Sequence, residues 1–359
     1  MTSSTEVGGP VSHGIRGLII NLILIILSLV VAIGLSEIYF RIFSPQPIVP
    51  RYVETSEFGI RKNIGHVRGR MIDPEYEHEF STNSQGFRGT VEYAVMKPHG
   101  VYRVLVLGDS TTLGHGVGDN DTFSFLLEEK LSNTRRTEVI NMGVSGFGTA
   151  EELIQLRNVG LQYAPDLVIL GYFPNDPYNN AVSKLFKIIS GQLVQDQGAF
   201  VPALYVRDHL YNIPGWSFLC QHSHVVNFLR NVASGFFQRR LGAQESMAST
   251  TPDQLTAEES ELTAALINEV ASETTRHGAK FILLNIPVVV NGHTIDNLPR
   301  PRINGLDSFL YIDVSKEPYA GHSIKDLYYA KDSHPKPLAH QLIADYLADY
   351  INKHHLAGI

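Results

Sequence analysis

Residues 17–36 form an uninterrupted apolar run, GLIINLILIILSLVVAIGLS, that contains no charged side chain. At about 1.5 Å of rise per residue, roughly 20 helical residues span the ~30 Å hydrocarbon core of a bilayer. A helix that is apolar on every side cannot turn one face to a protein core and the other to water. The run therefore predicts a transmembrane anchor at 17–36. No second run of this kind follows, so the rest of the chain is expected to fold on one side of the membrane.

A cleaved secretory signal is the competing interpretation of this run. Ala32 and Gly34 would suit a cleavage site that requires small residues. The run is longer than the usual apolar core of a signal, which favours an uncleaved anchor. Arg16 precedes the run whereas Arg41 and Arg51 follow it, so flanking positive charge does not fix its orientation.

Composition indicates a folded protein and excludes some partners. Of 359 residues, 43% are hydrophobic and 18% are charged, which supports a sizeable core. The net charge of −7 argues against nucleic acid, which binds basic surfaces. The single cysteine, Cys220, allows neither an intramolecular disulfide nor a cysteine-based zinc site. The histidines show no metal-binding spacing, so we expect no metal and no organic cofactor.

The chain divides into segments of different character. Residues 1–16 are rich in Ser, Thr and Gly and are predicted to be disordered. Residues 37–100 are predicted to be a linker and lead-in segment that packs on the following domain. They include a Pro-rich spacer at 44–50. Residues 101–355 are predicted to form the main domain, in which short apolar runs alternate with helical patterns.

This alternation predicts an α/β domain. Strands are expected at 101–108, 137–143, 166–173 and 280–287. Helices are expected at 121–132, 149–163 and 337–353, and a further helix should begin at 251–254 and end at 277–278. Thr149 and Glu152 have the spacing of a capping box at the start of the second helix. Strands separated by helices form parallel sheets covered by helices on both faces. Residues 177–250 interrupt the pattern and are predicted to be an insertion, or a lid, near the site.

Four polar segments adjoin these elements. Gly108-Asp109-Ser110 follows the first strand, Asn141-Met-Gly143 the second and Gly171-Tyr-Phe-Pro-Asn175-Asp176 the third, while Asp332-Ser-His334-Pro335 precedes the last helix. The loops at the carboxyl ends of parallel strands meet at one edge of the sheet. We therefore expect these segments to converge.

Their residue types are those of nucleophilic catalysis. A serine hydroxyl needs a base within hydrogen-bond reach, and histidine titrates near neutrality. A carboxylate orients the histidine, and N–H donors stabilise the oxyanion, each by about 3 kcal/mol. Ser110 and His334 are the candidate nucleophile and base. The backbone N–H groups of Ser110 and Gly143 and the side chain of Asn175 are the candidate oxyanion donors.

These segments resemble blocks I, II, III and V of the SGNH (GDSL) hydrolase family, in the same order, over residues 101–353. The resemblance implies a three-layer α/β/α flavodoxin-like fold with a five-stranded parallel sheet. It assigns Ser110 as nucleophile, His334 as base, and Gly143 and Asn175 as oxyanion donors. The lead-in sequence NSQGFRG at 83–89 is similar to that of bacterial members with an N-terminal anchor. Asp109 and Asp176 are expected to support the site.

Two positions depart from the family pattern. Lys331 stands three residues before His334, where the family usually has aspartate, and Asp332 is two before it. Either Asp332 completes a triad, or Ser110 and His334 act as a dyad assisted by a backbone carbonyl. The spacing from Gly171 to Asn175 is also longer than usual, which weakens a functional role for Gly171.

Each residue taken singly also fits a structural role. Ser110 suits a helix N-cap, Asn175 a turn and His334 the entry to a helix. Their joint placement at one edge favours catalysis. His115, His293 and His322 are interpreted as surface or loop histidines.

Three functions follow. The first is an esterase that cleaves an acyl or acetyl ester, of an envelope carbohydrate or lipid, through an acyl-Ser110 intermediate. The second is an O-acyltransferase that passes the same acyl group to a polysaccharide. The third is a non-catalytic envelope scaffold. In each case we expect a single-pass membrane protein with its main domain on the extracytoplasmic side.

Overall fold

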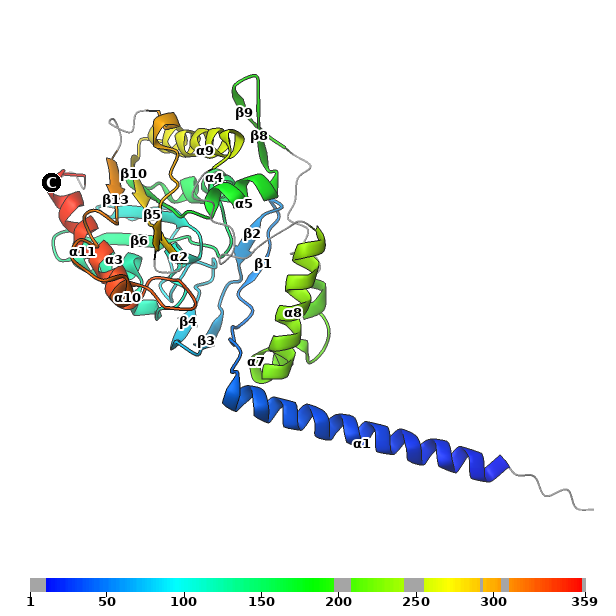
Figure 1. Cartoon of the computed structure of the whole chain (residues 1–359). Helices are drawn as coiled ribbons and strands as arrows, with labels where there is room; N and C mark the ends of the chain where they lie inside the picture. Colours follow the sequence, from blue (N-terminus) through cyan, green and yellow to red (C-terminus); the bar gives the residue numbers. More distant parts are fainter. Residues whose placement is uncertain (1–10, 197–207, 242–254, 291–292, 305–309, 357–359) are drawn as a thin grey trace, which may run out of the picture.

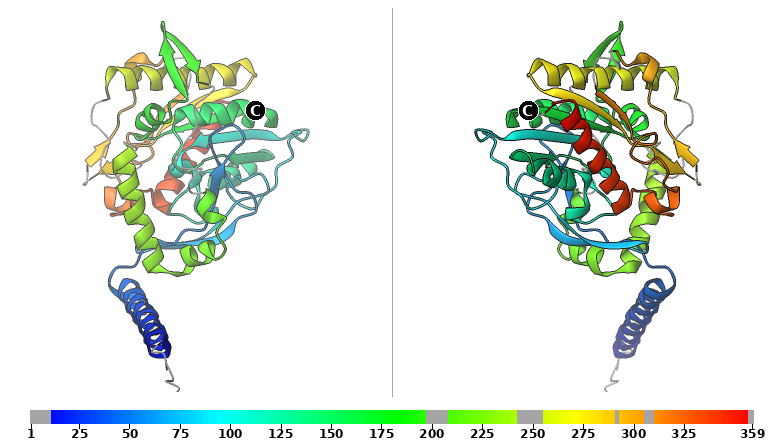
Figure 2. Two further views of the ribbon diagram at one scale, coloured as in Figure 1. Left: turned by 90° about the vertical axis from the view of Figure 1, so that its right-hand side faces the viewer. Right: turned by 90° about the vertical axis from the view of Figure 1, so that its left-hand side faces the viewer.

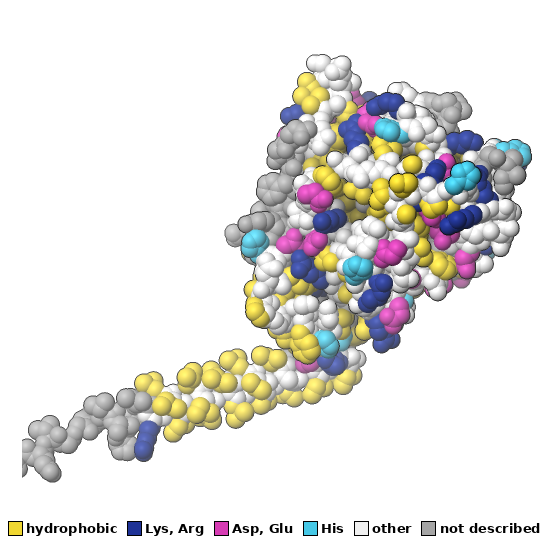
Figure 3. Space-filling model, turned by 180° about the vertical axis from the view of Figure 1, so that it is seen from behind, with side chains coloured by type: hydrophobic (Ala, Val, Ile, Leu, Met, Phe, Trp, Pro, Cys, Tyr) yellow, Lys and Arg dark blue, Asp and Glu magenta, His cyan; other side chains and the backbone are white. Residues whose placement is uncertain are grey.

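The computed structural model describes residues 11–196, 208–241, 255–290, 293–304 and 310–356 (Figure 1). One long helix, α1 (Val11–Phe43), stands apart from a rounded body. Within α1, residues Arg16–Phe43 are long and apolar enough to cross a membrane, and none of the most apolar stretch is buried. Figure 3 shows hydrophobic side chains along the middle of this helix. Residues 11–16, expected to be disordered, are the first turns of α1 instead, while 1–10 lie outside the described residues.

The body is built on a five-stranded parallel sheet, as expected. Its strands are β5 (Tyr102–Gly108), β6 (Thr137–Asn141), β7 (Leu167–Tyr172), β10 (Lys280–Asn285) and β13 (Leu310–Asp313). Their order is β13-β10-β7-β5-β6, the flavodoxin-like order. The edge strand β13 was not predicted, because a four-residue segment that pairs on one side only carries too little periodicity.

Helices cover both faces of this sheet (Figure 2). One apolar core lies under α3 (Phe123–Ser132) and α11 (Pro337–Lys353), the latter with the expected bounds. The other lies under α4 (Thr149–Asn158) and α9 (Ala257–Arg276). The molecule is therefore the three-layer α/β/α sandwich that the sequence predicted.

The starts of α4 and α9 differ from the prediction. The N-cap of α4 is Gly148, and the carboxylate of Glu152 is buried instead of closing a capping box. Asn180 of a neighbouring helix takes over the cap, because its Oδ1 accepts the N–H of Ala150 at 2.9 Å. The capping box of α9 uses Thr256 and Glu259. The predicted start at 251–254 lies outside the described residues.

The lead-in segment forms two antiparallel hairpins. They pair β1 (Val53–Thr55) with β2 (Arg61–Asn63), and β3 (Arg68–Asp73) with β4 (Tyr76–Ser81). From β2, Asn63 Nδ2 donates to Gly143 O at 2.9 Å, and Arg61 forms an ion pair with Glu151 at 3.1 Å. The lead-in thus contacts the loop after β6 and the helix that follows it.

Residues 177–250 contain regular structure where the sequence showed no pattern. The helix α5 (Asp176–Ser183) leads to a hairpin of β8 (Phe186–Ile189) and β9 (Gln192–Gln195), followed by α7 (Trp216–His222) and α8 (His224–Leu241). The start of α8 contacts the end of α1, since the backbone N–H of His224 donates to Glu37 at 3.0 Å (Figures 1 and 2). The remaining short elements are α2 (Ser110–Leu113), β11 (Val288–Val290), β12 (His293–Ile295), α10 (Ile324–Leu327) and three short 3₁₀ turns at Asp119–Asp121, Gly160–Tyr163 and Arg300–Arg302.

Candidate active site

The turn from β5 into α2 positions Ser110 at the carboxyl edge of the sheet. Gly108 has φ +155°, and a Cβ there would overlap the side chain of Thr112, so the turn requires glycine. Asp109 caps the helix, since its Oδ1 accepts the N–H of Thr111 at 2.7 Å. Ser110 is therefore the first residue of α2, where the backbone N–H has no partner within the helix.

The hydroxyl of Ser110 and the imidazole of His334 meet, although 224 residues separate them. Ser110 Oγ lies 2.9 Å from His334 Nε2, and His334 Nδ1 lies 3.0 Å from Asp332 Oδ2. The predicted convergence is therefore present, and Asp332 reaches the imidazole despite its shortened spacing. Ser333 between them has φ +63°, a left-handed conformation that reverses the chain within one residue. We attribute the contact between side chains only two positions apart to this reversal.

The electrostatics of this array stabilise the imidazolium form of His334 relative to free histidine. Burial opposes the imidazolium of His334, yet the charge and hydrogen bond of Asp332 outweigh it and raise the pKa of His334 above its ordinary value. Burial likewise opposes ionisation of Asp332, but the opposite charge and hydrogen bond of His334 hold the pKa of Asp332 far below its ordinary value. Asp332 therefore stays ionised beside His334 across the physiological range.

The tip of the β3–β4 hairpin holds the loop that carries Asp332, a role that sequence reasoning missed. Glu75 accepts three successive backbone N–H groups, those of Ala330 at 2.9 Å, Lys331 at 2.8 Å and Asp332 at 2.9 Å. A carboxylate that accepts several N–H groups is a strong, directional anchor. The lead-in segment is therefore part of the site's framework.

Tyr76, the next residue of the same hairpin, contacts the array directly. Its hydroxyl donates to Asp332 Oδ2 at 3.0 Å and lies 3.0 Å from His115 Nε2. Because the single hydroxyl proton goes to Asp332, His115 must donate from Nε2, which assigns its tautomer. No local pattern in the sequence links Tyr76 to residues so distant in the chain.

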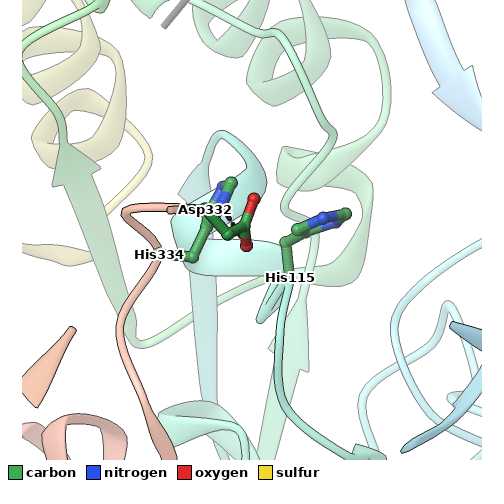
Figure 4. Close-up of side chains that lie close together, drawn as sticks. All are labelled: His115, Asp332 and His334. Atoms are coloured by element: carbon green, nitrogen blue, oxygen red, sulfur yellow. Dashed lines mark hydrogen bonds and ion pairs between the residues drawn. The ribbon is translucent and has the colours of Figure 1, made fainter. Parts of the chain in front are cut away.

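His115 lies in the turn after α2, as a loop histidine should, but it is partly buried and belongs to the site, which we did not expect. Its ring lies beside that of His334, with centroids 4.6 Å apart. Figure 4 draws both histidines together with Asp332. Burial, followed by the neighbouring charge of His334, lowers the pKa of His115 to about 3, so this ring is neutral. Its place five residues after Ser110 was the available signal, because the short α2 turns the chain back toward the nucleophile.

Two of the expected oxyanion donors, Gly143 and Asn175, lie against the turn and short helix that carry Ser110, and both already have partners. The N–H of Gly143 donates to Asn141 Oδ1 at 3.0 Å, and Asn175 Nδ2 donates to Asp109 Oδ2 at 3.2 Å. Asn175 retains a second N–H, whereas Gly143 must share or release its bond to serve an oxyanion. A Cβ at Gly143 would overlap the backbone of Leu113 in α2, which explains the glycine.

Two buried carboxyl groups, Asp176 and Glu152, lie behind this edge. Burial, then the charge of Asp109, raises the pKa of Asp176 well above its ordinary value. Burial, then the charge of Asp176, does the same for Glu152, whose two carboxyl oxygens lack hydrogen-bond partners among the described residues. We infer that this pair retains at least one proton at neutral pH. Asp176 Oδ2 also accepts the N–H of Phe173 at 3.2 Å, which steadies the turn before α5.

One group of side chains in the described residues has the geometry of metal ligands. His115, Asp332 and His334 offer ligand atoms that all lie within 4.8 Å of one another. In His334, Nε2 contacts Ser110 and Nδ1 contacts Asp332, so each ring nitrogen already has a partner. The arrangement therefore fits a hydrogen-bonded array better than a resident metal centre.

A parallel α/β/α sandwich with a Ser–His–Asp array at the carboxyl edge of its sheet has the architecture of a serine hydrolase. Residues 104–347 match the sequence profile described as GDSL-like lipase/acylhydrolase. The chain belongs to this family, which confirms the resemblance found in its motifs.

The chain is also similar to individual known proteins. The chain is 33% identical over 111 residues to an arylesterase from Vibrio mimicus, a match that covers 29% of this chain and only 54% of the relative. Among solved structures, TesA is 14% identical with a TM-score of 0.41, covering 70% of this chain and 98% of its own. A catalytic mutant of Axe2, an acetylxylan esterase from Geobacillus stearothermophilus, is 14% identical with a TM-score of 0.39, covering 72% and 96% respectively.

Proposed function

We propose that this chain is a membrane-anchored serine esterase in which Ser110 attacks the carbonyl carbon of an acyl or acetyl ester. The observation that carries the proposal is the hydrogen bond of 2.9 Å between Ser110 Oγ and His334 Nε2. A second hydrogen bond, of 3.0 Å, joins His334 Nδ1 to Asp332 Oδ2. In this reaction His334 accepts the hydroxyl proton as the Ser110 Oγ–carbonyl bond forms. His334 then gives that proton to the departing alcohol, which leaves acyl-Ser110.

Water completes the reaction. His334 removes a proton from water, the hydroxide adds to the acyl carbon, and the carboxylic acid leaves as Ser110 recovers its proton. The N–H groups of Ser110, Gly143 and Asn175 are suited to hold the negative charge of both tetrahedral intermediates. The charge of Asp332 stabilises the imidazolium that forms in each step.

Ester cleavage by purified full-length protein tests this proposal. With an aryl acetate, we expect Ser110→Ala to lose at least about 10³-fold in kcat, as removal of a nucleophile does. Ser145→Ala is the matched control, because Ser145 lies on the nearby loop after β6 and its hydroxyl contacts Tyr52, at 2.7 Å, instead of His334. Equal activity of Ser110→Ala and wild type would refute the assignment.

Acyl transfer to a sugar hydroxyl is a second candidate. It is favoured by the burial of the array, since Ser110 is 6% and His334 4% exposed, and restricted water access slows hydrolysis of an acyl-enzyme. Incubation with an acetyl donor and a polysaccharide acceptor distinguishes the two reactions. Acylated polysaccharide would support transfer, and free acid alone would exclude it.

The apolar helix α1 supports a location at the membrane. We propose in addition that the main domain lies on the extracytoplasmic side, where envelope carbohydrate and lipid esters are accessible. Labelling of intact cells with a membrane-impermeant fluorophosphonate tests this orientation. Labelling only after lysis would place the domain on the cytoplasmic side.

A further inference from the structure

The helical hairpin α7–α8, within the insertion, exposes a stripe of large apolar side chains. Leu229, Val232 and Phe236 are 58%, 54% and 55% exposed, and their spacing places them on one face of α8. On α7, Phe218 is 63% exposed. The inner side of the hairpin has different contacts, since the buried Asn227 donates to Cys220 O at 2.7 Å. Leu229, Val232 and Phe218 therefore present apolar surface on the outside of the hairpin.

This hairpin is fixed to the last turns of α1. The carboxylate of Glu37 accepts the hydroxyl of Ser223 at 2.8 Å and the N–H groups of His224 and Val225 at 3.0 Å, which caps the start of α8. Arg41 donates to the carbonyl of His222, the last residue of α7, at 2.7 Å. Both helix ends at the bend of the hairpin are thus bound by side chains of α1.

Aromatic contacts strengthen the same joint. Phe40 of α1 lies against Phe228 of α8, with ring centroids 4.6 Å apart. Earlier in the insertion, Asp208 forms an ion pair with Arg51 at 3.1 Å. This pair ties the segment ahead of α7 to the lead-in. The hairpin is therefore held between α1 and the body.

The same turns of α1 mark the expected edge of the bilayer. The apolar run ends at residue 36, and Glu37 is followed by Tyr39, Phe40 and Phe43. Aromatic side chains gather where a transmembrane helix passes through the headgroup layer. The hairpin is thus attached at the level of the headgroups and not above them.

The direction of α8 fits this level. In Figure 1, α8 runs across the end of α1, with the sheet on one side and the direction in which α1 extends on the other. The two views of Figure 2 agree that α1, α7 and α8 lie on the same side of the body. An amphipathic helix with this orientation lies along a membrane surface.

Charge points to the same partner. Residues 208–241 contain three arginines, Arg230, Arg239 and Arg240, and one acidic residue, Asp208, although the whole chain carries a net charge of −7. An apolar stripe within a segment of excess positive charge suits a bilayer that contains anionic lipids. A second copy of this acidic chain is a poorer match in charge.

We propose that the α7–α8 hairpin is a second membrane contact, which lies in the headgroup layer beside α1 and holds the catalytic domain against the lipid surface. The inference rests on the proposed anchoring of α1. The apolar stripe on α8 then meets the acyl boundary, and the excess positive charge of the segment suits the anionic lipid headgroups.

Single-tryptophan reporters test the inference in the full chain. The protein has one tryptophan, Trp216, so Trp216→Phe gives a silent background. In that background, Leu229→Trp reports on α8 and Leu27→Trp on the centre of α1. Met96→Trp, at a position that is 87% exposed outside the hairpin, is the control for free solvent. Each variant is placed in nanodiscs of phosphatidylcholine and phosphatidylglycerol, with ordinary or brominated acyl chains, and fluorophosphonate labelling checks its fold.

We expect brominated lipid to quench the tryptophan fluorescence of Leu27→Trp strongly and to leave that of Met96→Trp unchanged. The fluorescence of Leu229→Trp should fall about twofold, because interfacial helices bury ~5–10 Å into the boundary. Quenching of Leu27→Trp with none at Leu229→Trp would overturn the inference while the anchor stands. Protection of that unquenched Leu229→Trp from aqueous iodide would then identify a protein on the stripe. Quenching at neither Leu27→Trp nor Leu229→Trp would overturn the anchor and the inference together.

Discussion

Replacing Tyr76 with phenylalanine isolates the contribution of the lead-in hairpin to the active site. The change removes the hydroxyl that donates to Asp332 Oδ2 at 3.0 Å and contacts His115 Nε2 at 3.0 Å. It keeps the ring, which packs on Tyr329 with centroids 4.8 Å apart. The perturbation is therefore the loss of the hydrogen bond to the partly buried, ionised carboxylate of Asp332, together with the one that His115 Nε2 donates to the hydroxyl, without loss of packing.

The expected size follows from that bond. A hydrogen bond to a charged group contributes about 1.5–3 kcal/mol, and each 1.36 kcal/mol changes a rate about tenfold. If the bond serves to orient Asp332, kcat for an aryl acetate should fall ~10- to 150-fold in Tyr76→Phe with little change in KM. Without the Tyr76 proton, the negative charge of Asp332 acts more fully on His334. The acid limb of the pH profile should therefore move to higher pH.

A matched variant separates this effect from a general loss of stability. Tyr93 is also buried, and its hydroxyl donates to Val139 O at 3.2 Å, on the strand β6. Tyr93→Phe should lose similar stability, measured by thermal unfolding, but keep its kcat. Activity of Tyr76→Phe within about twofold of that of Tyr93→Phe would refute the positioning role, since a lost charged hydrogen bond should cost far more.

Three further variants probe other parts of the site. Asp332→Asn should reduce kcat by about 10²–10⁴-fold. It should also move the acid limb of the kcat/KM profile to lower pH, because the charge that raises the pKa of His334 is lost. An acid limb at the wild-type pH would contradict this. Gly143→Ala should lower kcat and unfold at lower temperature, because the new Cβ overlaps the backbone of Leu113; wild-type values would show that the loop adjusts freely. Glu152→Gln should stabilise the fold by about 1–3 kcal/mol at neutral pH in denaturant titrations. Burial raises the pKa of Glu152 in the folded protein above its pKa in the unfolded chain. The wild type therefore loses stability as the pH rises above the pKa of the unfolded chain, and the difference in stability between wild type and Glu152→Gln should vanish in acid.

The sequence predicted those parts of the fold that local patterns determine. The strand β7 is apolar at nearly every position because both faces are buried, and α11 has a clear apolar stripe between Pro337 and Lys353. The edge strand β13 was missed because it is short. The cap of α4 was wrong because Asn180, from a different helix, competes with the local capping box.

The same division applies to the site. The contact between Ser110 and His334 could be predicted because Ser110 follows a recognisable strand and His334 precedes a recognisable helix. Glu75 and Tyr76 were not, because Glu75 contacts the backbone at Ala330, 255 residues away, through the docking of a hairpin that has no periodic signal linking it to the site. His115 was misread since its burial depends on that same hairpin.

Mass spectrometry of the fluorophosphonate adduct tests the central claim most directly. We predict that wild-type protein gains one phosphonyl group on the peptide that contains Ser110, that Ser110→Ala gains none, and that His334→Ala reacts at a small fraction of the wild-type rate. Equal modification of wild type and Ser110→Ala, or a folded wild type that stays unmodified, would contradict the assignment of Ser110 as a nucleophile activated by His334.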